Sequence, residues 1–126
     1  MSERTDAEWQ VLADRIARVV MGWEAKPYGG GLIYPVPEQV NMMRLIRVKD
    51  WQPHNDVDVG QALAVLDRIA ETYHYGHSIF LLASHLTHYR VLIWKGFGCV
   101  GMWQGEHTSR AKAICLAIEK FMEESC

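Results

Sequence analysis

The side chains best suited to chemistry in this sequence are its histidines, which form two closely spaced pairs. His74 and His77 lie three residues apart, as do His85 and His88. Two histidines joined by a carboxylate can bind a divalent metal ion. Glu71 is the nearest carboxylate to the first pair, and the second pair has no obvious third ligand. The sequence therefore favours histidines at loop ends and predicts no metal site and no cofactor, with a small metal-dependent hydrolase as an alternative.

Nucleophilic catalysis has two further candidates. Cys99 and His107 could act as nucleophile and base, but such a site also needs a group that orients the base. The acids available, Glu106 and Glu119, fit the start and the surface of a helix. Ser84 precedes a histidine but lacks the surrounding glycines of a nucleophile elbow. No catalytic residue is predicted, which favours a protein that is not an enzyme.

Three consecutive glycines, Gly29 to Gly31, resemble a phosphate-binding loop in composition alone. A P-loop requires a following Lys with Ser or Thr, and a dinucleotide-binding loop requires a strand before it and a helix after it. The sequence has neither pattern, so we expect a flexible loop, mobile at a binding surface.

The candidate binding site is an aromatic segment punctuated by glycines. It contains Trp94, Lys95, Phe97, Trp103 and Gln104. Aromatic side chains near a cation can stack on a base or insert into a partner's pocket. This set predicts a site for a partner protein or a small anionic ligand. The alternative is that the tryptophans pack beneath the C-terminal helix.

Size and composition predict a single domain over residues 1–126. A chain of 126 residues buries enough surface to fold without a disulfide or metal. Its net charge is -2 and no basic stripe is present, which argues against general nucleic-acid binding. Its apolar stretches are too short to span a membrane. Three cysteines without a CxxC pair predict reduced thiols and a cytoplasmic location.

Three amphipathic helices are expected to position these side chains. A capping box at Thr5–Glu8 opens the first helix, and Gly22 suits its end. Apolar residues then recur at helical spacing in each predicted segment. The predicted helices cover residues 6–21, a segment from a cap at His54 or Asn55 to near Thr72, and a segment that follows Thr108 or Ser109.

The strands are expected between the helices. Segments 78–83 and 89–94 predict a hairpin that is apolar on both faces, which indicates a sheet covered on both sides. Met42–Trp51 and Cys99–Trp103 predict further strands. Leu32–Tyr34 lies among prolines and is expected to be an edge strand or an extended loop, which could pair copies into a homo-oligomer. The expected fold is α+β, a three-layer helix/antiparallel sheet/helix sandwich.

Three short segments recur in the order and at about the distances of a known family. They are Met21-Gly22-Trp23-Glu24, Trp51-Gln52-Pro53-His54-Asn55-Asp56-Val57 and Ala113-Ile114-Cys115-Leu116-Ala117. In these segments the chain resembles the phage ABA sandwich domain. The resemblance implies helix–sheet–helix layering and a phage or prophage origin, and it implies no chemistry. It favours a non-enzymatic accessory protein that binds a host protein or a small anionic ligand, as counter-defence proteins do.

Overall fold

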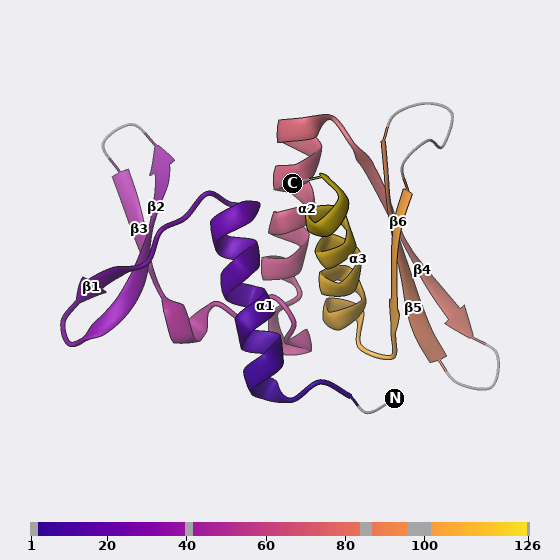
Figure 1. Ribbon diagram of the computed structural model, residues 1–126, viewed down its shortest axis with the longest axis horizontal. Coiled ribbons are helices and arrows are strands. Elements are labelled where there is room, and N and C mark those ends of the chain that lie inside the picture. The colour runs from indigo at the N-terminus through magenta and orange to yellow at the C-terminus, as the bar shows by residue number, and fades with distance from the viewer. Residues whose placement is uncertain (1–2, 40–41, 84–86, 96–101, 126) are drawn as a thin grey trace. The chain divides into compact units, whose positions relative to one another are not determined.

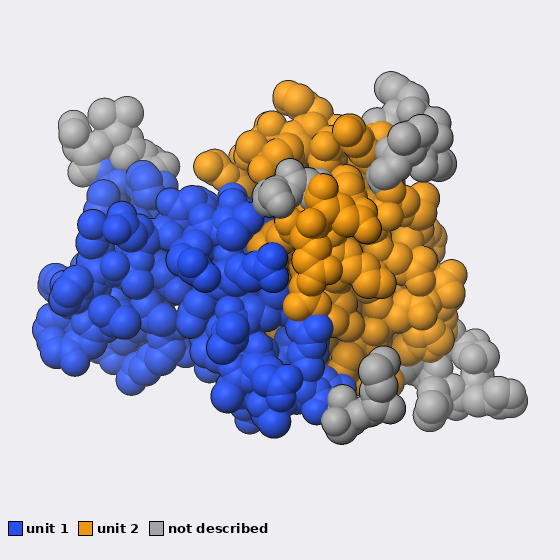
Figure 2. Space-filling view, viewed as in Figure 1, with its two compact units in different colours: residues 1–52 blue, residues 53–126 orange. Residues whose placement is uncertain are grey.

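The computed structural model describes residues 3–39, 42–83, 87–95 and 102–125. These residues form three α-helices, six β-strands and two short 3-10 turns (Figure 1). The predicted α+β class is confirmed, and its strands form two separate antiparallel sheets of three strands each. The chain divides into two compact units, residues 1–52 and 53–126, and each unit holds one sheet (Figure 2). That residues 1–126 form a single domain stays a prediction.

Helix α1 (Asp6–Val19) begins at the predicted capping box. The Glu8 N–H donates to Thr5 Oγ1 at 3.2 Å, and the Thr5 N–H donates to Glu8 Oε1 at 3.3 Å. Gly22 follows the helix with a φ of +71°, a left-handed conformation that glycine adopts without strain. The predicted start is confirmed. The helix ends at Val19 with Val20 as its cap, so Gly22 lies in the turn beyond the cap and is not the cap itself. Its apolar stripe is buried: Trp9, Leu12, Ala13, Ile16 and Ala17.

The sheet of the first unit contains β1 (Lys26–Tyr28), β2 (Gly31–Gln39) and β3 (Met42–Arg47). Gly29 and Gly30 join β1 to β2, with φ values of +57° and +83°. Two central residues with positive φ define a tight type I′ hairpin turn, which matches the twist of the flanking strands. The flexible loop expected from the glycine run is therefore wrong, because these residues form a two-residue turn.

Strand β2 lies between β1 and β3, so the expectation that Leu32–Tyr34 is an edge strand or a loop is wrong. β1 pairs with β2 only from Gly31 to Ile33, and Pro35 and Pro37 lie beyond that pairing. Alternate residues of a strand direct their N–H groups to the same side. Both prolines therefore share the direction of Gly31 and Ile33, toward β1. No described strand pairs with β2 on that side at Pro35 and Pro37, so the lack of an N–H in these prolines costs no hydrogen bond of the described sheet.

The end of β3 is anchored to α1. A 3-10 turn (η1, Val48–Asp50) replaces the last part of the strand that was predicted to reach Trp51. The Trp51 indole is buried and its Nε1–H donates to Ala13 O on α1 at 2.8 Å. From β2, the Tyr34 hydroxyl donates to Asp14 Oδ1 at 2.9 Å. These two bonds fix the sheet and the turn against one helix.

The second unit begins with a 3-10 turn (η2, Asp56–Asp58) that leads into α2 (Gly60–Tyr73). Asn55 is the cap, because its side chain accepts from the Val57 N–H at 2.9 Å. The cap thus belongs to the 3-10 turn, and the α-helix proper starts later than the sequence predicted. Asp58 Oδ1 accepts from the Gly60 N–H at 3.0 Å, and this hydrogen bond links the end of η2 to the first residue of α2.

Helix α3 (Arg110–Ser125) is capped from two directions. Ser109, one of the two predicted caps, accepts from the Lys112 N–H through its hydroxyl at 3.2 Å. Asp56, expected in the first turn of the second helix, instead accepts from the Ala111 N–H at 2.9 Å. A carboxylate suits this position, because the N-terminus of a helix carries partial positive charge.

The second sheet contains β4 (Gly76–Ala83), β5 (Thr87–Trp94) and β6 (Met102–His107), in that order. The predicted hairpin is confirmed as β4 and β5. The segment expected at Cys99–Trp103 becomes β6 from Met102 onward, and residues 99–101 lie outside the described residues.

Helix α3 packs on the face of this sheet that carries Val91 and Ile93, both fully buried (Figure 1). The approach is closest at Gly105, where an added Cβ would lie 2.3 Å from a backbone oxygen of α3. On the opposite face Phe80 is 46% exposed and Met102 is 44% exposed. Helix α3 therefore covers one face of the sheet, and that the sheet is covered on both faces stays a prediction.

Candidate functional site

The structure does not bring the predicted aromatic set together at one surface. Trp103 pairs with Ile93 across the β5–β6 ladder, whereas Trp94 pairs with Met102, one residue along. Because successive side chains of a strand point to opposite faces, the two tryptophans lie on opposite faces of the sheet. Their closeness in sequence therefore creates no shared site.

Trp103 belongs to the core of the second unit. Its side chain is 5% exposed, and its indole stacks on Tyr75 at 5.7 Å between ring centroids. The ring of Phe121 on α3 meets it edge-on at 5.3 Å, and the indole N–H donates to a carboxylate oxygen of Glu124. This is the packing beneath the C-terminal helix that the sequence left open as the alternative.

Trp94 and Lys95 lie at the end of β5, and the Trp94 side chain is on the opposite face of the sheet from Trp103. The half-buried Trp94 indole lies over Gly76, its cross-strand partner, where an added Cβ would lie 2.5 Å from the ring. Lys95 is exposed and Gln104 is half-buried. Phe97 lies outside the described residues. That this set binds a partner stays a prediction.

The histidine and cysteine candidates form no metal centre among the residues that the structure describes: no group of three or more His, Cys, Asp or Glu side chains could hold an ion. His74 ends α2 in a left-handed conformation, and His77 lies on β4. His85 and Cys99 lie outside the described residues. His107 Nδ1 accepts from the Ser109 N–H at 2.9 Å, so this ring helps to start α3.

A pocket in the first unit is the stronger candidate site. Its volume is about 950 Å³, within the range of small-molecule sites. It is called the hairpin pocket here, because the β1–β2 turn forms part of its wall. The lining residues are Gln10, Tyr28, Gly29, Gly30, Gly31, Leu32, Ile33, Leu45, Arg47, Val48, Lys49 and Gln52.

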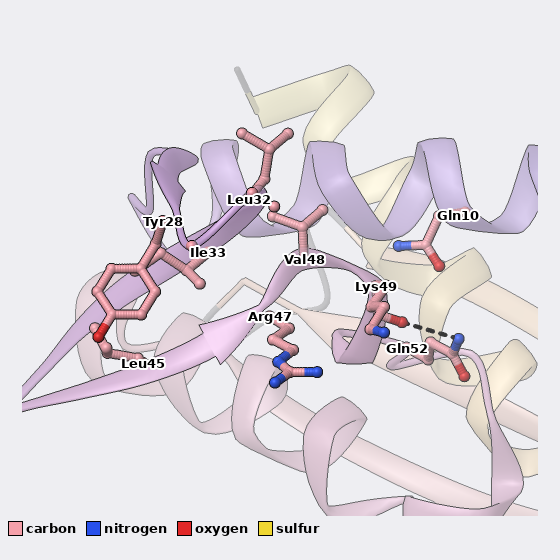
Figure 3. Close-up of a pocket in the computed structure, with 12 residues that line it drawn as sticks. Gln10, Tyr28, Leu32, Ile33, Leu45, Arg47, Val48, Lys49 and Gln52 are labelled. Carbon is pink, nitrogen blue, oxygen red and sulfur yellow. Dashed lines mark hydrogen bonds between the residues drawn. The ribbon is translucent and has the colours of Figure 1, made fainter.

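The hairpin pocket has an apolar end and a polar end (Figure 3). Tyr28 and Leu45 lie at one end, Lys49 and Gln52 at the other, and Arg47 lies between them. The sheet register explains this order. Arg47 and Leu45 pair with successive same-face residues of β2, so they share a face of the sheet. The turn η1 then carries Lys49 beyond the end of β3.

The electrostatic character of the hairpin pocket comes from Arg47 and Lys49. Both side chains are exposed, and neither forms an ion pair with any carboxylate in the described part of the chain. No Asp or Glu is among the lining residues that the structure describes. A guanidinium supplies several N–H donors in a fixed plane and an ammonium supplies three, so together they suit an anionic group.

Neutral polar groups complete the polar end. Gln10 Nε2 donates to Trp51 O at 3.1 Å and to Asp14 Oδ1 at 3.3 Å. Because both partners are acceptors, the amide nitrogen is fixed toward them and Gln10 Oε1 is left as an acceptor. In a two-residue turn the N–H groups of the central residues, Gly29 and Gly30, have no partner in the ladder. The pocket therefore offers cationic donors, neutral donors and an acceptor.

Sequence reasoning missed the hairpin pocket, although two signals for it were present. Two glycines between short extended segments are a hairpin signal. Leu45, Arg47 and Lys49 alternate along one predicted strand face, which places two cations at the end of that face. Neither signal shows that the turn and the cations meet, because that depends on β2 pairing with both neighbours.

Comparisons with protein-family models, with curated proteins and with solved structures return no match. The resemblance to the phage ABA sandwich domain therefore stays a prediction. Within the described residues, no helix has the length and apolar character needed to cross a bilayer.

Proposed function

We propose that the protein is a binding module whose first unit holds a small anionic ligand in the hairpin pocket. The observation that carries the proposal is that Arg47 and Lys49 line the same pocket and that no carboxylate accompanies them among its described lining residues. Hydrogen bonds from a cation to a phosphate or carboxylate are about twice as strong as neutral ones. An anion would therefore be the favoured occupant.

The same lining residues argue for binding over catalysis. In the part of the chain that the structure describes, they include no His, Cys, Ser, Thr, Asp or Glu, and Tyr28 is the one with a hydroxyl. General acid–base and nucleophilic catalysis draw mainly on those residue types. The pocket residues in the described chain can hold and orient an anion, and they offer no group suited to attacking one.

The proposal is tested by calorimetric titration of the whole protein with inorganic pyrophosphate and with ribose 5-phosphate at low ionic strength. Arg47→Gln combined with Lys49→Gln is expected to lower the affinity by more than tenfold, since a hydrogen bond to a charged group is worth about 1.5–3 kcal/mol. Arg44→Gln is the matched control. It removes one positive charge from β3, as Arg47→Gln alone would, but Arg44 alternates with the pocket-lining residues and is not one of them. Equal affinities in the double variant and the wild type would contradict the proposal.

The biological setting is proposed on the resemblance alone. A phage or prophage accessory protein in the bacterial cytoplasm could sequester an anionic ligand that its host uses. A position of the gene among early phage genes would support interference with the host. A position among virion genes would contradict it.

A further inference from the structure

The hairpin pocket holds more than an anion site, because its apolar end presents an aromatic ring. Tyr28 is 63% exposed and Leu45 is 48% exposed. Exposed apolar side chains that gather at the wall of a pocket favour a ligand with an apolar part. A bare inorganic anion would leave this end of the pocket empty.

The ring of Tyr28 has room for a stacking partner because of the residue opposite it. Tyr28 pairs with Gly31 in the β1–β2 ladder. A cross-strand neighbour normally packs its side chain on the residue that it faces, and glycine has none. An added Cβ at Gly31 would meet Tyr28 O first, at 4.0 Å. The space beside the ring is thus open to a ligand.

The distance between the two ends suits a ligand longer than a single ring. β2 separates β1 from β3, so Tyr28 and Arg47 lie about two strand spacings apart, on the order of 10 Å across the sheet. Gln10 Oε1 lies toward the polar end, where it can accept from a hydroxyl (Figure 3). The pocket therefore presents a stacking ring at one end, then Arg47, and then Lys49 with the Gln10 acceptor at the other end.

From this arrangement we infer that the hairpin pocket binds a nucleoside monophosphate, an inference that rests on the proposed anion-binding function. The base stacks on Tyr28, and the phosphate accepts from Arg47 and Lys49. Base–aromatic stacking requires only a π-face, so the ring need not be one particular base. Residues 1–52 hold seven basic and seven acidic residues, a formal net charge of zero. A free nucleotide therefore fits better than a strand, which needs an extended basic groove.

The test compares four probes by calorimetry on the whole protein: adenosine 5′-monophosphate, adenosine, ribose 5-phosphate and inorganic phosphate. Stacking is expected to make the nucleotide bind roughly 5- to 150-fold more tightly than ribose 5-phosphate. Tyr28→Ala is expected to abolish that difference, and Tyr28→Trp to retain it. Gly31→Val is expected to reduce it, because the new side chain takes the space beside the ring.

The outcomes separate this inference from the proposed function. If ribose 5-phosphate binds as tightly as the nucleotide, and the Arg47→Gln/Lys49→Gln variant binds neither, the nucleotide inference is overturned and anion binding stands. A nucleotide preference that survives Tyr28→Ala also overturns the inference. If none of the four probes binds the wild type, both the inference and the proposed function are overturned.

Discussion

Replacing Gly105 by alanine is expected to destabilise the second unit, because α3 passes very close to β6 at this residue. A Cβ at position 105 would lie 2.3 Å from Ala113 O and 2.5 Å from Ala117 N. Both are backbone atoms of α3, so a change of rotamer cannot relieve the contact. Either the helix must move away from the sheet or the strand must bend, and the buried side chains between them lose contact.

The magnitude follows from two opposing terms. Overpacking a well-packed core costs about 1–3 kcal/mol. Replacing glycine by alanine also raises the free energy of unfolding by about 0.4–1 kcal/mol, because alanine reduces the conformational freedom of the unfolded chain. We expect a net loss of about 1–2 kcal/mol in the free energy of unfolding, from the difference of these terms. In a chain of this length that lowers Tm by roughly 4–8 °C.

The assay is thermal unfolding followed by circular dichroism, with Gly31→Ala as the matched control. Gly31 is also a strand glycine, but an added Cβ there would meet nothing closer than Tyr28 O at 4.0 Å. The control is expected to keep its Tm or to gain slightly. Equal Tm values for the two variants would refute the close approach of α3 to β6.

Three further predictions concern Tyr34, Asp56 and Cys115. Burial, together with the hydrogen bond to Asp14, raises the pKa of the Tyr34 phenol above its usual value. Tyr34 thus contributes stability that is complete below about pH 10 and falls as the pH rises. Tyr34→Phe should lower the free energy of unfolding by about 1.5–3 kcal/mol at pH 7. Above about pH 10, the free energy of unfolding of this variant should fall less steeply with pH than that of the wild type. Asp56→Ala should cost about 1–2 kcal/mol in urea unfolding, because the Ala111 N–H at the start of α3 loses its acceptor. Burial raises the pKa of the Cys115 thiol, so a variant with serine at the other two cysteines should resist a thiol reagent at pH 8 until it is unfolded.

Each of these has an outcome that would contradict it. Asp67 is exposed on α2, so Asp67→Ala is the control for Asp56→Ala. Equal losses in the free energy of unfolding in both variants would show that Asp56 does not stabilise α3 as a cap. An identical alkaline transition in Tyr34→Phe and the wild type would show that the phenol is not shielded. Rapid labelling of Cys115 in the folded protein would contradict its burial.

Local signals in the sequence predicted the helices well. The capping box at Thr5–Glu8 and the glycine at position 22 act within a few residues, so both could be predicted without knowing the fold. The β4–β5 hairpin also joins neighbouring segments. The cap that Asp56 provides to α3 could not be predicted, because it joins residues 55 positions apart in the chain.

Strand pairing limited the prediction of the sheets and of the site. Apolar strands indicate burial, but they do not say which strands pair, and the six strands form two sheets where one was expected. Trp94 and Trp103 were predicted to act together because they are close in sequence. A strand places odd and even positions on opposite faces, and the ladder separates these two. The same pairing rule places Tyr28, Leu45 and Arg47 on one face of the first sheet, where they line the hairpin pocket.

The most direct test of anion binding in the hairpin pocket is a titration of isotope-labelled protein with adenosine 5′-monophosphate, followed by amide chemical shifts. The hairpin pocket predicts the largest shifts at Gly29, Gly30 and Lys49, with smaller changes in residues 53–126. The largest shifts at Trp94 and Gln104, or no shifts at millimolar ligand, would contradict the assignment of the site.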